Sequence, residues 1–263
     1  MLQITDIKKT FFPGTINERI ALAGVSLTLE DGDFVTVIGS NGAGKSTLLN
    51  AIAGRFQVDS GAIDIDGKSI RRLPDHARAQ YVGRVFQDPM AGTAPDLTIE
   101  QNLALALRRG QPRGLAMGVS NARREVFREA LEKLDLGLEN RLKTLVGLLS
   151  GGQRQALSLL MASYTHPRIL LLDEHTAALD PARADHVTAL TEQVVAEGSL
   201  TTLMVTHNMA QAIRVGNRLI MMHEGRIILE LDAEQKRRAT VEQLLGEFAK
   251  IKGAVVDDRT MLQ

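Results

Sequence analysis

A glycine-rich segment with a single lysine has the spacing of a phosphate-binding loop. It reads Gly39-Ser40-Asn41-Gly42-Ala43-Gly44-Lys45-Ser46-Thr47, which fits G-x-x-x-x-G-K-[ST] between an apolar run at 34–38 and a helical stretch from 46 to about 53. Glycines let backbone N–H groups approach phosphate oxygens, and the helix N-terminus adds a favourable dipole. Lys45 can reach the outer phosphates and the Ser46 hydroxyl can ligate Mg²⁺. A glycine turn with a chance lysine is the alternative. The strand, loop and helix together favour a nucleoside triphosphate site.

Two carboxylates, Asp173 and Glu174, directly follow the apolar run Ile169-Leu170-Leu171-Leu172. Ligands of open parallel sheets bind at the carboxyl edge of the strands. Asp173 suits coordination of Mg²⁺, directly or through water, and Glu174 can orient or deprotonate an attacking water. Taken alone, such a pair is more often an exposed turn. Its occurrence together with the phosphate loop favours the metal and water roles.

A second glycine-containing segment, Leu149-Ser150-Gly151-Gly152-Gln153, precedes a helical stretch. Ser150 suits the N-cap of that helix, and the two glycines leave its backbone donors open to an anion. A helix cap after a glycine turn explains the same residues without any ligand. The residue types alone favour this plainer interpretation.

The elements that must position these residues alternate between strand and helix patterns. Residues 2–38 and 62–65 have strand character, with an Asp-Gly turn at 66–67. After residue 150 we expect a helix to about 164, strands at 169–172 and 201–205, a helix at 181–197, and two short strands within 218–231. The tail predicts one last helix, with Thr240 and Gln243 spaced as a capping box. This rhythm predicts parallel βαβ units.

Between about residues 90 and 150 the strand pattern gives way to helices, expected at 98–109 and 120–136. A linker with Gly110, Pro112, Gly114 and Gly118 separates them. Residues 101–148 carry nine Lys and Arg against five Asp and Glu. We interpret this region as a helical insertion in an α/β core.

Composition excludes several classes of protein. The 263 residues include 31 Lys and Arg against 31 Asp and Glu, so a formal net charge of zero offers no general attraction to nucleic acid. The absence of Cys excludes disulfides, Cys-ligated zinc and iron–sulfur clusters. The N-terminal residues lack the apolar stretch of a signal peptide, and no apolar run approaches the roughly 18–20 residues of a membrane span. We therefore expect a soluble protein that reaches a membrane only through a partner.

Over residues 2–232 the chain resembles the ATP-binding subunits of ABC transporters. Six segments match the motifs of that family in its order. They are the Walker A loop at 39–47, the Q-loop Val85-Phe86-Gln87-Asp88-Pro89, the signature at 149–153, Walker B with the catalytic glutamate at 169–174, the D-loop Ala178-Leu179-Asp180 and the switch segment Val205-Thr206-His207. The family also places an adenine-stacking aromatic near Lys9-Thr10-Phe11-Phe12. Phe11 is preferred over Phe12 for this role, although both can instead be core residues.

The resemblance implies an α/β fold with a P-loop NTPase (RecA-like) core, an N-terminal antiparallel β subdomain and an inserted α-helical subdomain. It divides one ABC ATPase domain, 1–263, into a catalytic core at 1–89 and 154–232, a helical subdomain at 90–153 and a short helical tail at 233–263. It also implies ATP hydrolysis with Mg²⁺ bound by Ser46, Gln87 and Asp173. Glu174, His207 and Gln87 are the implied catalytic residues. ATP is bound by Phe11, by Gly39, Ser40, Asn41, Gly42, Ala43, Gly44, Lys45, Ser46 and Thr47, and by Ser150, Gly151, Gly152, Gln153 and Asp180.

The implied partners are a second copy of the chain in an ATP-sandwich dimer, transmembrane permease subunits and an extracytoplasmic substrate-binding protein, without nucleic acid. The chain then lies peripherally on the cytoplasmic face of the inner membrane and energises solute transport, in the import direction. Short stretches around 87–93, 173–180 and 206–212 are most similar to ATPases of branched-chain-amino-acid-type permeases. A soluble ABC ATPase, for example of the iron–sulfur assembly type, and an exporter subunit are the alternatives.

The chain departs from the family pattern at four positions. Ala156 and Met161 replace arginines common after the signature, His175 stands where proline is frequent, and Asn208 stands where Asp often follows the switch histidine. None of the four carries a phosphate, metal or water role. They weaken assignment to a substrate subgroup and leave the expected ATPase activity intact.

Overall fold

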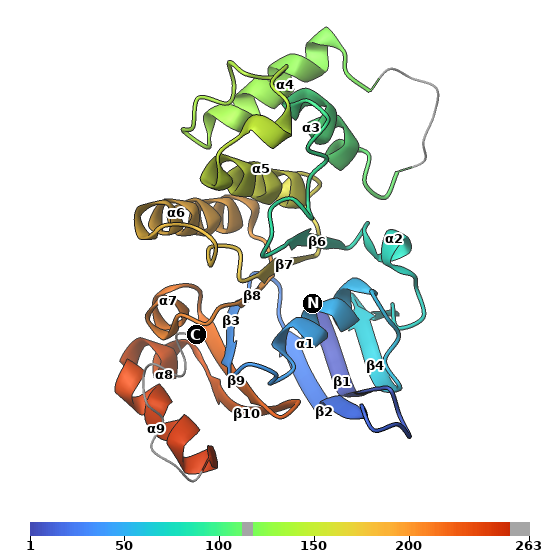
Figure 1. Ribbon diagram of the computed structural model, residues 1–263, viewed down its shortest axis with the longest axis vertical. Helices are drawn as coiled ribbons and strands as arrows, with labels where there is room; N and C mark the ends of the chain where they lie inside the picture. The colour runs from blue at the N-terminus through green and yellow to red at the C-terminus, as the bar shows by residue number, and fades with distance from the viewer. Residues whose placement is uncertain (112–117, 253–263) are drawn as a thin grey trace. The chain divides into compact units, whose positions relative to one another are not determined.

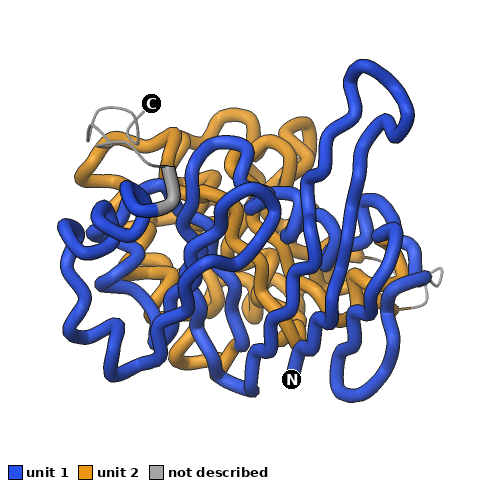
Figure 2. The backbone as a smooth tube through the Cα atoms, turned by 90° about the horizontal axis from the view of Figure 1, so that it is seen from below, with its two compact units in different colours: residues 1–74, 201–263 blue, residues 75–200 orange. Residues whose placement is uncertain are grey.

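The computed structural model describes residues 1–111 and 118–252, which belong to two compact units (Figure 2). Unit 1 comprises residues 1–74 together with the chain from residue 201, and unit 2 comprises residues 75–200. Pro112 and Gly114 of the expected linker lie outside the described residues. Within the described ranges, no helix combines the length and the apolar character that crossing a bilayer requires.

Unit 1 contains an antiparallel sheet in the order β2-β1-β4-β5 (Figure 1). Its strands are β1 (Leu2–Phe11), β2 (Arg19–Leu29), β4 (Ser60–Ile65) and β5 (Lys68–Ser69). Within β2, Val25, Leu27 and Leu29 are buried and the residues between them are more exposed. This period of two turns one face of the strand toward the core, as the sequence pattern predicts.

The other strands of unit 1 position the phosphate loop. The central strand β3 (Phe34–Gly39) runs parallel to β8 (Thr202–Val205) on one side and to β9 (Arg218–His223) on the other, and β10 (Arg226–Leu231) is antiparallel to β9. Strand β3 is buried along almost its whole length, which explains why its residues are apolar except Thr36, whose hydroxyl donates to the Ala212 carbonyl. Helix α1 (Lys45–Ala53) follows this strand.

Between residues 233 and 252, the described part of the tail of unit 1 contains two helices, so the expectation of a single one is wrong. Helix α8 (Ala233–Arg238) spans six residues, too few to show a helical period, and is marked only by its capping residue Asp232. Helix α9 (Val241–Lys252) has the predicted capping box between Thr240 and Gln243. The short helix α7 (Met209–Arg214) is likewise not indicated by the sequence pattern.

Two buried residues make the tail an integral part of unit 1. Phe248 of α9 is fully buried in a cluster with Ile38 of β3 and residues of α7 and β9. The Lys236 ammonium of α8 is buried and donates to the carbonyls of Val215 and Arg218, at the end of α7 and the start of β9. Burying a cationic group requires such acceptors, so α8 is fixed in place.

Unit 2 contains two parallel strands and a group of helices. Strand β6 (Val82–Val85) pairs with β7 (Ile169–Asp173), and α5 (Gly151–Ser163) packs beside α6 (Pro181–Gly198) (Figure 1). Helices α3 (Ile99–Leu107) and α4 (Asn121–Glu132) confirm the two helices expected in the insertion, although both end before the predicted boundary. The sequence pattern does not indicate α2 (Asp75–Arg78) or the four-residue strand β6.

His175, which stands where the family often has proline, is a buried structural residue of unit 2. It is 2% exposed, and its Nε2 lies 3.0 Å from the hydroxyl of Thr191 on α6. That hydroxyl donates to the Val187 carbonyl, so its oxygen accepts from the imidazole. Burial lowers the pKa of His175 from 6.5 to about 4, because the charged form loses its hydration. The imidazole is neutral at physiological pH and ties the chain after β7 to α6.

We expect His175 to make stability depend on pH between about 6.5 and 4. Below pH 6.5 the unfolded chain binds a proton at this imidazole that the folded protein excludes until about pH 4. The free energy of unfolding therefore falls as the pH is lowered, by up to ~1.4 kcal/mol per pH unit. Urea unfolding at several pH values should show a weaker dependence in His175→Gln than in the control His76→Gln, whose side chain is 82% exposed. Equal dependence in both variants would contradict this role.

Candidate functional site

The predicted phosphate loop connects β3 to α1 in unit 1. Residues 40–44 form the turn between the strand and the helix, and Gly44 is the N-cap residue of α1 with φ +101°. A Cβ atom at Gly44 would lie 2.5 Å from the Ala21 carbonyl oxygen. Only glycine combines that conformation with so close an approach. Ser46, in the first turn of α1, is exposed.

The Lys45 ammonium is folded back over its own loop. Its Nζ donates to the carbonyl oxygens of Gly39 at 2.6 Å and Ser40 at 3.2 Å, and the residue is only 6% exposed. The loop is held from outside as well, because the amide of Gly225, in the turn between β9 and β10, donates to Ala43. The positive charge is therefore kept beside the backbone donors at the start of α1, a suitable position for phosphate.

His207 and the phosphate loop belong to the same unit and follow neighbouring parallel strands. Val37 of β3 pairs with Val205 of β8, and the Thr206 amide donates to the Val37 carbonyl. Both strands therefore end at one edge, with His207 exposed directly after it. Asn208, the departure from the usual Asp, is the N-cap of α7 and accepts from the Gln211 amide. An Asn serves this capping role as well as an Asp.

The two candidate adenine-stacking residues lie in different environments at the end of β1. Phe11 is half-buried and meets Phe56 edge-to-face, with ring centroids 5.3 Å apart. Phe12 is 66% exposed with φ +52°, so it is not a core residue. The Cα of Phe11 is paired across the hairpin with Arg19, whose guanidinium donates to the Gly42 carbonyl at 3.3 Å. The hairpin thus reaches the phosphate loop through Arg19.

In unit 2 the predicted metal-binding residues follow two paired strands. Val85 of β6 is opposite Leu172 of β7, so Asp173, the last residue of β7, and Gln87, two residues after β6, lie at the same edge of the sheet. Asp173 accepts an ion-pair hydrogen bond from Arg84 at 2.9 Å, and both side chains are nearly buried. The Arg84 guanidinium also lies 4.6 Å from the Phe86 ring centroid. These contacts fix the Asp173 carboxylate at this edge.

Glu174 has φ +44°, a backbone conformation that L-residues rarely adopt. Such conformations cost of order 1–3 kcal/mol and persist where the surroundings enforce them. The Ala177 amide donates to the Glu174 carbonyl, which closes a turn after β7. A few residues later Asp180 is the N-cap of α6, accepting from the Arg183 amide at 3.2 Å. The segment from Asp173 to Asp180, which connects β7 to α6, is therefore held by hydrogen bonds at both ends.

The signature segment forms the N-terminus of α5. Ser150 is its N-cap, and a capping box joins it reciprocally to Gln153, with hydrogen bonds of 3.2 and 3.3 Å. The predicted capping role of Ser150 is therefore confirmed. Gly151 and Gly152 occupy the first turn, where backbone N–H groups lack intrahelical partners. The Gln155 side chain donates to the Phe86 carbonyl, which connects α5 to the residue before Gln87.

The two units divide the predicted site residues between them. Unit 1 contains Phe11, the phosphate loop and His207, and unit 2 contains Gln87, the signature segment, Asp173, Glu174 and Asp180. Arg19 and Arg84 are contacts of these residues that the motifs do not include. The sequence shows that Arg84 lies three residues before Gln87, so its place near the predicted site could have been noticed. The contact of Arg19 with the phosphate loop could not, because it depends on the pairing of β1 with β2.

The combination of an anion-accepting loop, oxygen ligands and a carboxylate that can act on water suits phosphoryl transfer to water. The family model for the ABC transporter matches residues 22–177. The tyrosine transport ATP-binding protein of Clostridioides difficile is 46% identical over 253 residues, which cover 94% of this chain and 98% of that protein. The aliphatic sulfonates import ATP-binding protein of Agrobacterium fabrum is 37% identical and covers 82% and 75%.

Solved structures agree with this assignment. A dimeric ATP-binding cassette in a post-hydrolysis state with ADP and Pi has a TM-score of 0.76 at 31% identity, covering 89% of this chain and 99% of that one. A cassette in its ADP conformation has a TM-score of 0.77 at 25% identity, covering 94% and 98%. The predicted fold class, a P-loop NTPase with an antiparallel β subdomain and helical parts, is confirmed. This chain therefore belongs to the ABC transporter family, as one of its ATP-binding, ATP-hydrolysing cassettes.

Proposed function

We propose that this cassette energises the import of a small solute through a separate membrane permease, docked at the cytoplasmic face of the membrane. The observation that carries the proposal is the 46% identity, over nearly the whole of both chains, to a protein named for tyrosine transport. A relative named for sulfonate import supports the same direction of transport. Amino acids are therefore the first class of solute to test, delivered by an extracytoplasmic substrate-binding protein.

In the proposed nucleotide site, the backbone N–H groups of residues 40–46 bind the phosphates and Phe11 stacks on adenine. When ATP binds, the Lys45 ammonium releases the carbonyl oxygens of Gly39 and Ser40 and donates to phosphate oxygens instead. The buried ammonium therefore has hydrogen-bond acceptors both with and without the nucleotide. The open first turn of α1 supports this role. Arg19 connects the β1–β2 hairpin to the phosphate loop through its hydrogen bond to the Gly42 carbonyl.

Ser46, Gln87 and Asp173 supply a hydroxyl, an amide oxygen and a carboxylate, which are the oxygen donors that Mg²⁺ prefers. When bound, Mg²⁺ neutralises phosphate charge and orients the terminal phosphates. Arg84 donates a hydrogen bond to one oxygen of the Asp173 carboxylate and so fixes the orientation of the carboxylate. Glu174 orients and deprotonates the attacking water, and its position directly after Asp173 at the end of β7 supports this role. His207 contacts the terminal phosphate.

The signature and D-loop residues complete the site of a second copy of the chain. Ser150, Gly151, Gly152 and Gln153 present the N-terminus of α5 to the ATP held by the other copy, and Asp180 lies at the same interface. Helix N-termini attract phosphate, and the capping box orients Ser150. The dimeric cassette with ADP and Pi supports this arrangement. ATP joins the two copies, and hydrolysis removes the contact that holds them together.

We expect Glu174→Gln to trap an ATP-bound dimer. The amide cannot accept the water proton, so hydrolysis should fall by about 10²-fold or more while nucleotide binding is retained. Light scattering in saturating Mg-ATP should then report a dimer for the variant, and a monomer when ATP is omitted. A variant that stays monomeric in saturating ATP would contradict the sandwich.

A hollow in unit 2 suits docking of the permease. Its volume is about 810 Å³, and it is lined by the segment after Gln87, by the end of α3 and by the chain around α2. Leu105 of α3 lines it and is 54% exposed, beside the basic Arg108. A permease segment seated here contacts the chain that leads from Gln87. This supports transmission of ATP-driven closure to the permease.

The double variant Leu105→Asp/Arg108→Glu should uncouple transport. Solute uptake by the cassette reconstituted with its permease and binding protein should fall more than about tenfold, because interface anchors of this kind contribute ~2 kcal/mol. Basal ATP hydrolysis without the permease should be unchanged. The matched control Val126→Asp/Lys133→Glu makes equivalent changes at exposed positions of α4 and its C-cap. Equal uptake by both variants would refute docking in this hollow.

A further inference from the structure

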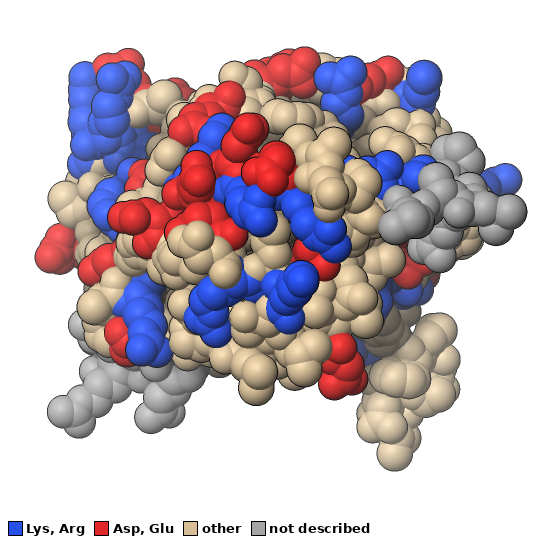
Figure 3. Space-filling view, turned by 90° about the horizontal axis from the view of Figure 1, so that it is seen from above, with Lys and Arg blue, Asp and Glu red and all other residues tan. Residues whose placement is uncertain are grey.

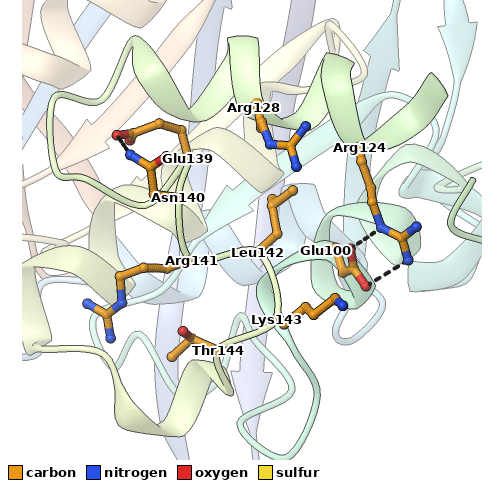
Figure 4. Close-up of a pocket in the computed structure, with 9 residues that line it drawn as sticks. All are labelled: Glu100, Arg124, Arg128, Glu139, Asn140, Arg141, Leu142, Lys143 and Thr144. Atoms are coloured by element: carbon orange, nitrogen blue, oxygen red, sulfur yellow. Dashed lines mark hydrogen bonds and ion pairs between the residues drawn. The ribbon is translucent and has the colours of Figure 1, made fainter. Parts of the chain in front are cut away.

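A second hollow in unit 2 contains none of the predicted nucleotide-site residues. It has a volume of about 480 Å³ and lies between α4, the first turn of α3 and the segment 139–144 (Figure 4). We refer to it as the insertion pocket, defined by Glu100, Arg124, Arg128, Glu139, Asn140, Arg141, Leu142, Lys143 and Thr144. On the face that carries α4, basic and acidic side chains lie next to one another (Figure 3). The insertion pocket departs from that balance, because four cationic side chains line it against two carboxylates.

One carboxylate of the insertion pocket is already neutralised. Arg124 Nε donates to Glu100 Oε2 at 2.7 Å and its terminal nitrogen donates to Oε1 at 3.3 Å. Glu100 is only 8% exposed, so this bidentate pair is a structural link between α4 and α3. Arg124 is therefore occupied, and the excess positive charge belongs to the other cations.

Arg128, Arg141 and Lys143 are available to a ligand. Within residues 1–111 and 118–252, neither Arg141 nor Lys143 has a carboxylate within ion-pair distance. Arg128 forms an ion pair with Glu125, one turn earlier on α4, and both side chains are substantially exposed at 43% and 65%. Exposed pairs of this kind contribute little, so Arg128 can exchange its partner for a ligand. Glu139 offsets one of the three charges.

The floor of the insertion pocket is preorganised. The Glu100 amide donates to the Leu142 carbonyl and the Ile99 amide to the Thr144 carbonyl, each at 3.0 Å. Leu142 is 6% exposed and anchors this segment in the core of unit 2. Arg128, on α4, faces this fixed segment across the hollow (Figure 4). The backbone of the floor is therefore already ordered, which lowers the entropic cost of binding a ligand.

We propose that the insertion pocket binds a small soluble molecule that carries at least two phosphate-type negative charges. Guanidinium groups recognise phosphate oxygens through paired donors, and a lysine adds a further charge. The volume falls in the range of small-molecule sites, and it exceeds what a single phosphate ion fills. Leu142 is the only aliphatic hydrophobic residue that lines it and is itself buried, so the chemistry favours a polar ligand over an apolar one.

Such a ligand bridges α4 and the segment that leads to the signature. Beyond Thr144 the chain continues through the 3₁₀ turn η1 (Val146–Leu148) to Ser150, and the Val146 amide donates to the Leu97 carbonyl before α3. Occupation of the insertion pocket therefore stiffens the support of the α5 N-terminus. The ligand acts on the cassette without entering its nucleotide site.

Pyrophosphate binding to the full chain tests the proposal. Because we expect the phosphate loop to bind pyrophosphate as well, it is first filled with one equivalent of a non-hydrolysable Mg-ATP analogue. No excess triphosphate or Mg²⁺ is then left to occupy the insertion pocket or to complex the titrant, and pyrophosphate is titrated by calorimetry. We expect one site per chain, weakened about tenfold for each cation removed in Arg141→Gln/Lys143→Gln. The control Lys68→Gln/Lys133→Gln removes the same charge at exposed positions outside the insertion pocket and should bind as the wild type does. Circular dichroism checks that both variants are folded.

Two results would overturn the proposal: no pyrophosphate binding by the analogue-saturated wild type, or equal weakening in the pocket variant and the control. Lipid headgroups share the phosphate chemistry, so flotation with phosphatidylglycerol vesicles forms the second arm. Vesicle capture that depends on Arg141 and Lys143 would overturn the assignment to a soluble ligand. No dependence of capture on these residues supports it.

Discussion

The Lys45 ammonium and the backbone that surrounds it set the strictest requirement in this fold. A buried cation must be hydrogen-bonded, and here the carbonyls of Gly39 and Ser40 supply the acceptors. That arrangement needs a loop that turns back on itself, a strand that delivers it and a helix whose first turn is open. Two features hold this loop in place. Strand β3 lies between β8 and β9 in the sheet, and the Gly225 amide donates a hydrogen bond to the Ala43 carbonyl.

In unit 2, as at the helices of the unit 1 tail, polar side chains at the ends of the elements hold the structure in place. Thr98, Ser120, Ser150 and Asp180 each cap a helix with a side-chain oxygen, and Arg84 fixes Asp173 at the end of β7. The signature serine therefore has two uses. It satisfies an orphan donor within its own helix, and in the proposed dimer the same helix N-terminus meets the phosphates of the other copy.

The motifs predicted the cassette fold because each has a local physical cause that spacing reveals. The loop at 39–47 needs glycines and a following helix, and a serine directly before a helical stretch indicates the N-cap at Ser150, to which the structure adds a capping box with Gln153. The sequence does not reveal contacts that depend on the paths of distant segments. Arg19 reaches Gly42 only because hairpin register places it there, and the insertion pocket arises where α3, α4 and residues 139–144 meet. The helices α2 and α8 span too few residues to show a helical period, and β6 contains Gly83 and Arg84, so no apolar run marks it as a strand.

The central claim is that the phosphate loop and the signature act on one nucleotide, held between two copies of the chain. Hydrogen exchange of backbone amides measures this most directly, because phosphate-bound N–H groups are protected. Adding Mg²⁺ and a non-hydrolysable ATP analogue should slow exchange in both segments, 40–47 and 150–153. Protection of 40–47 with unchanged exchange at 150–153 would exclude the signature from the site and contradict the account.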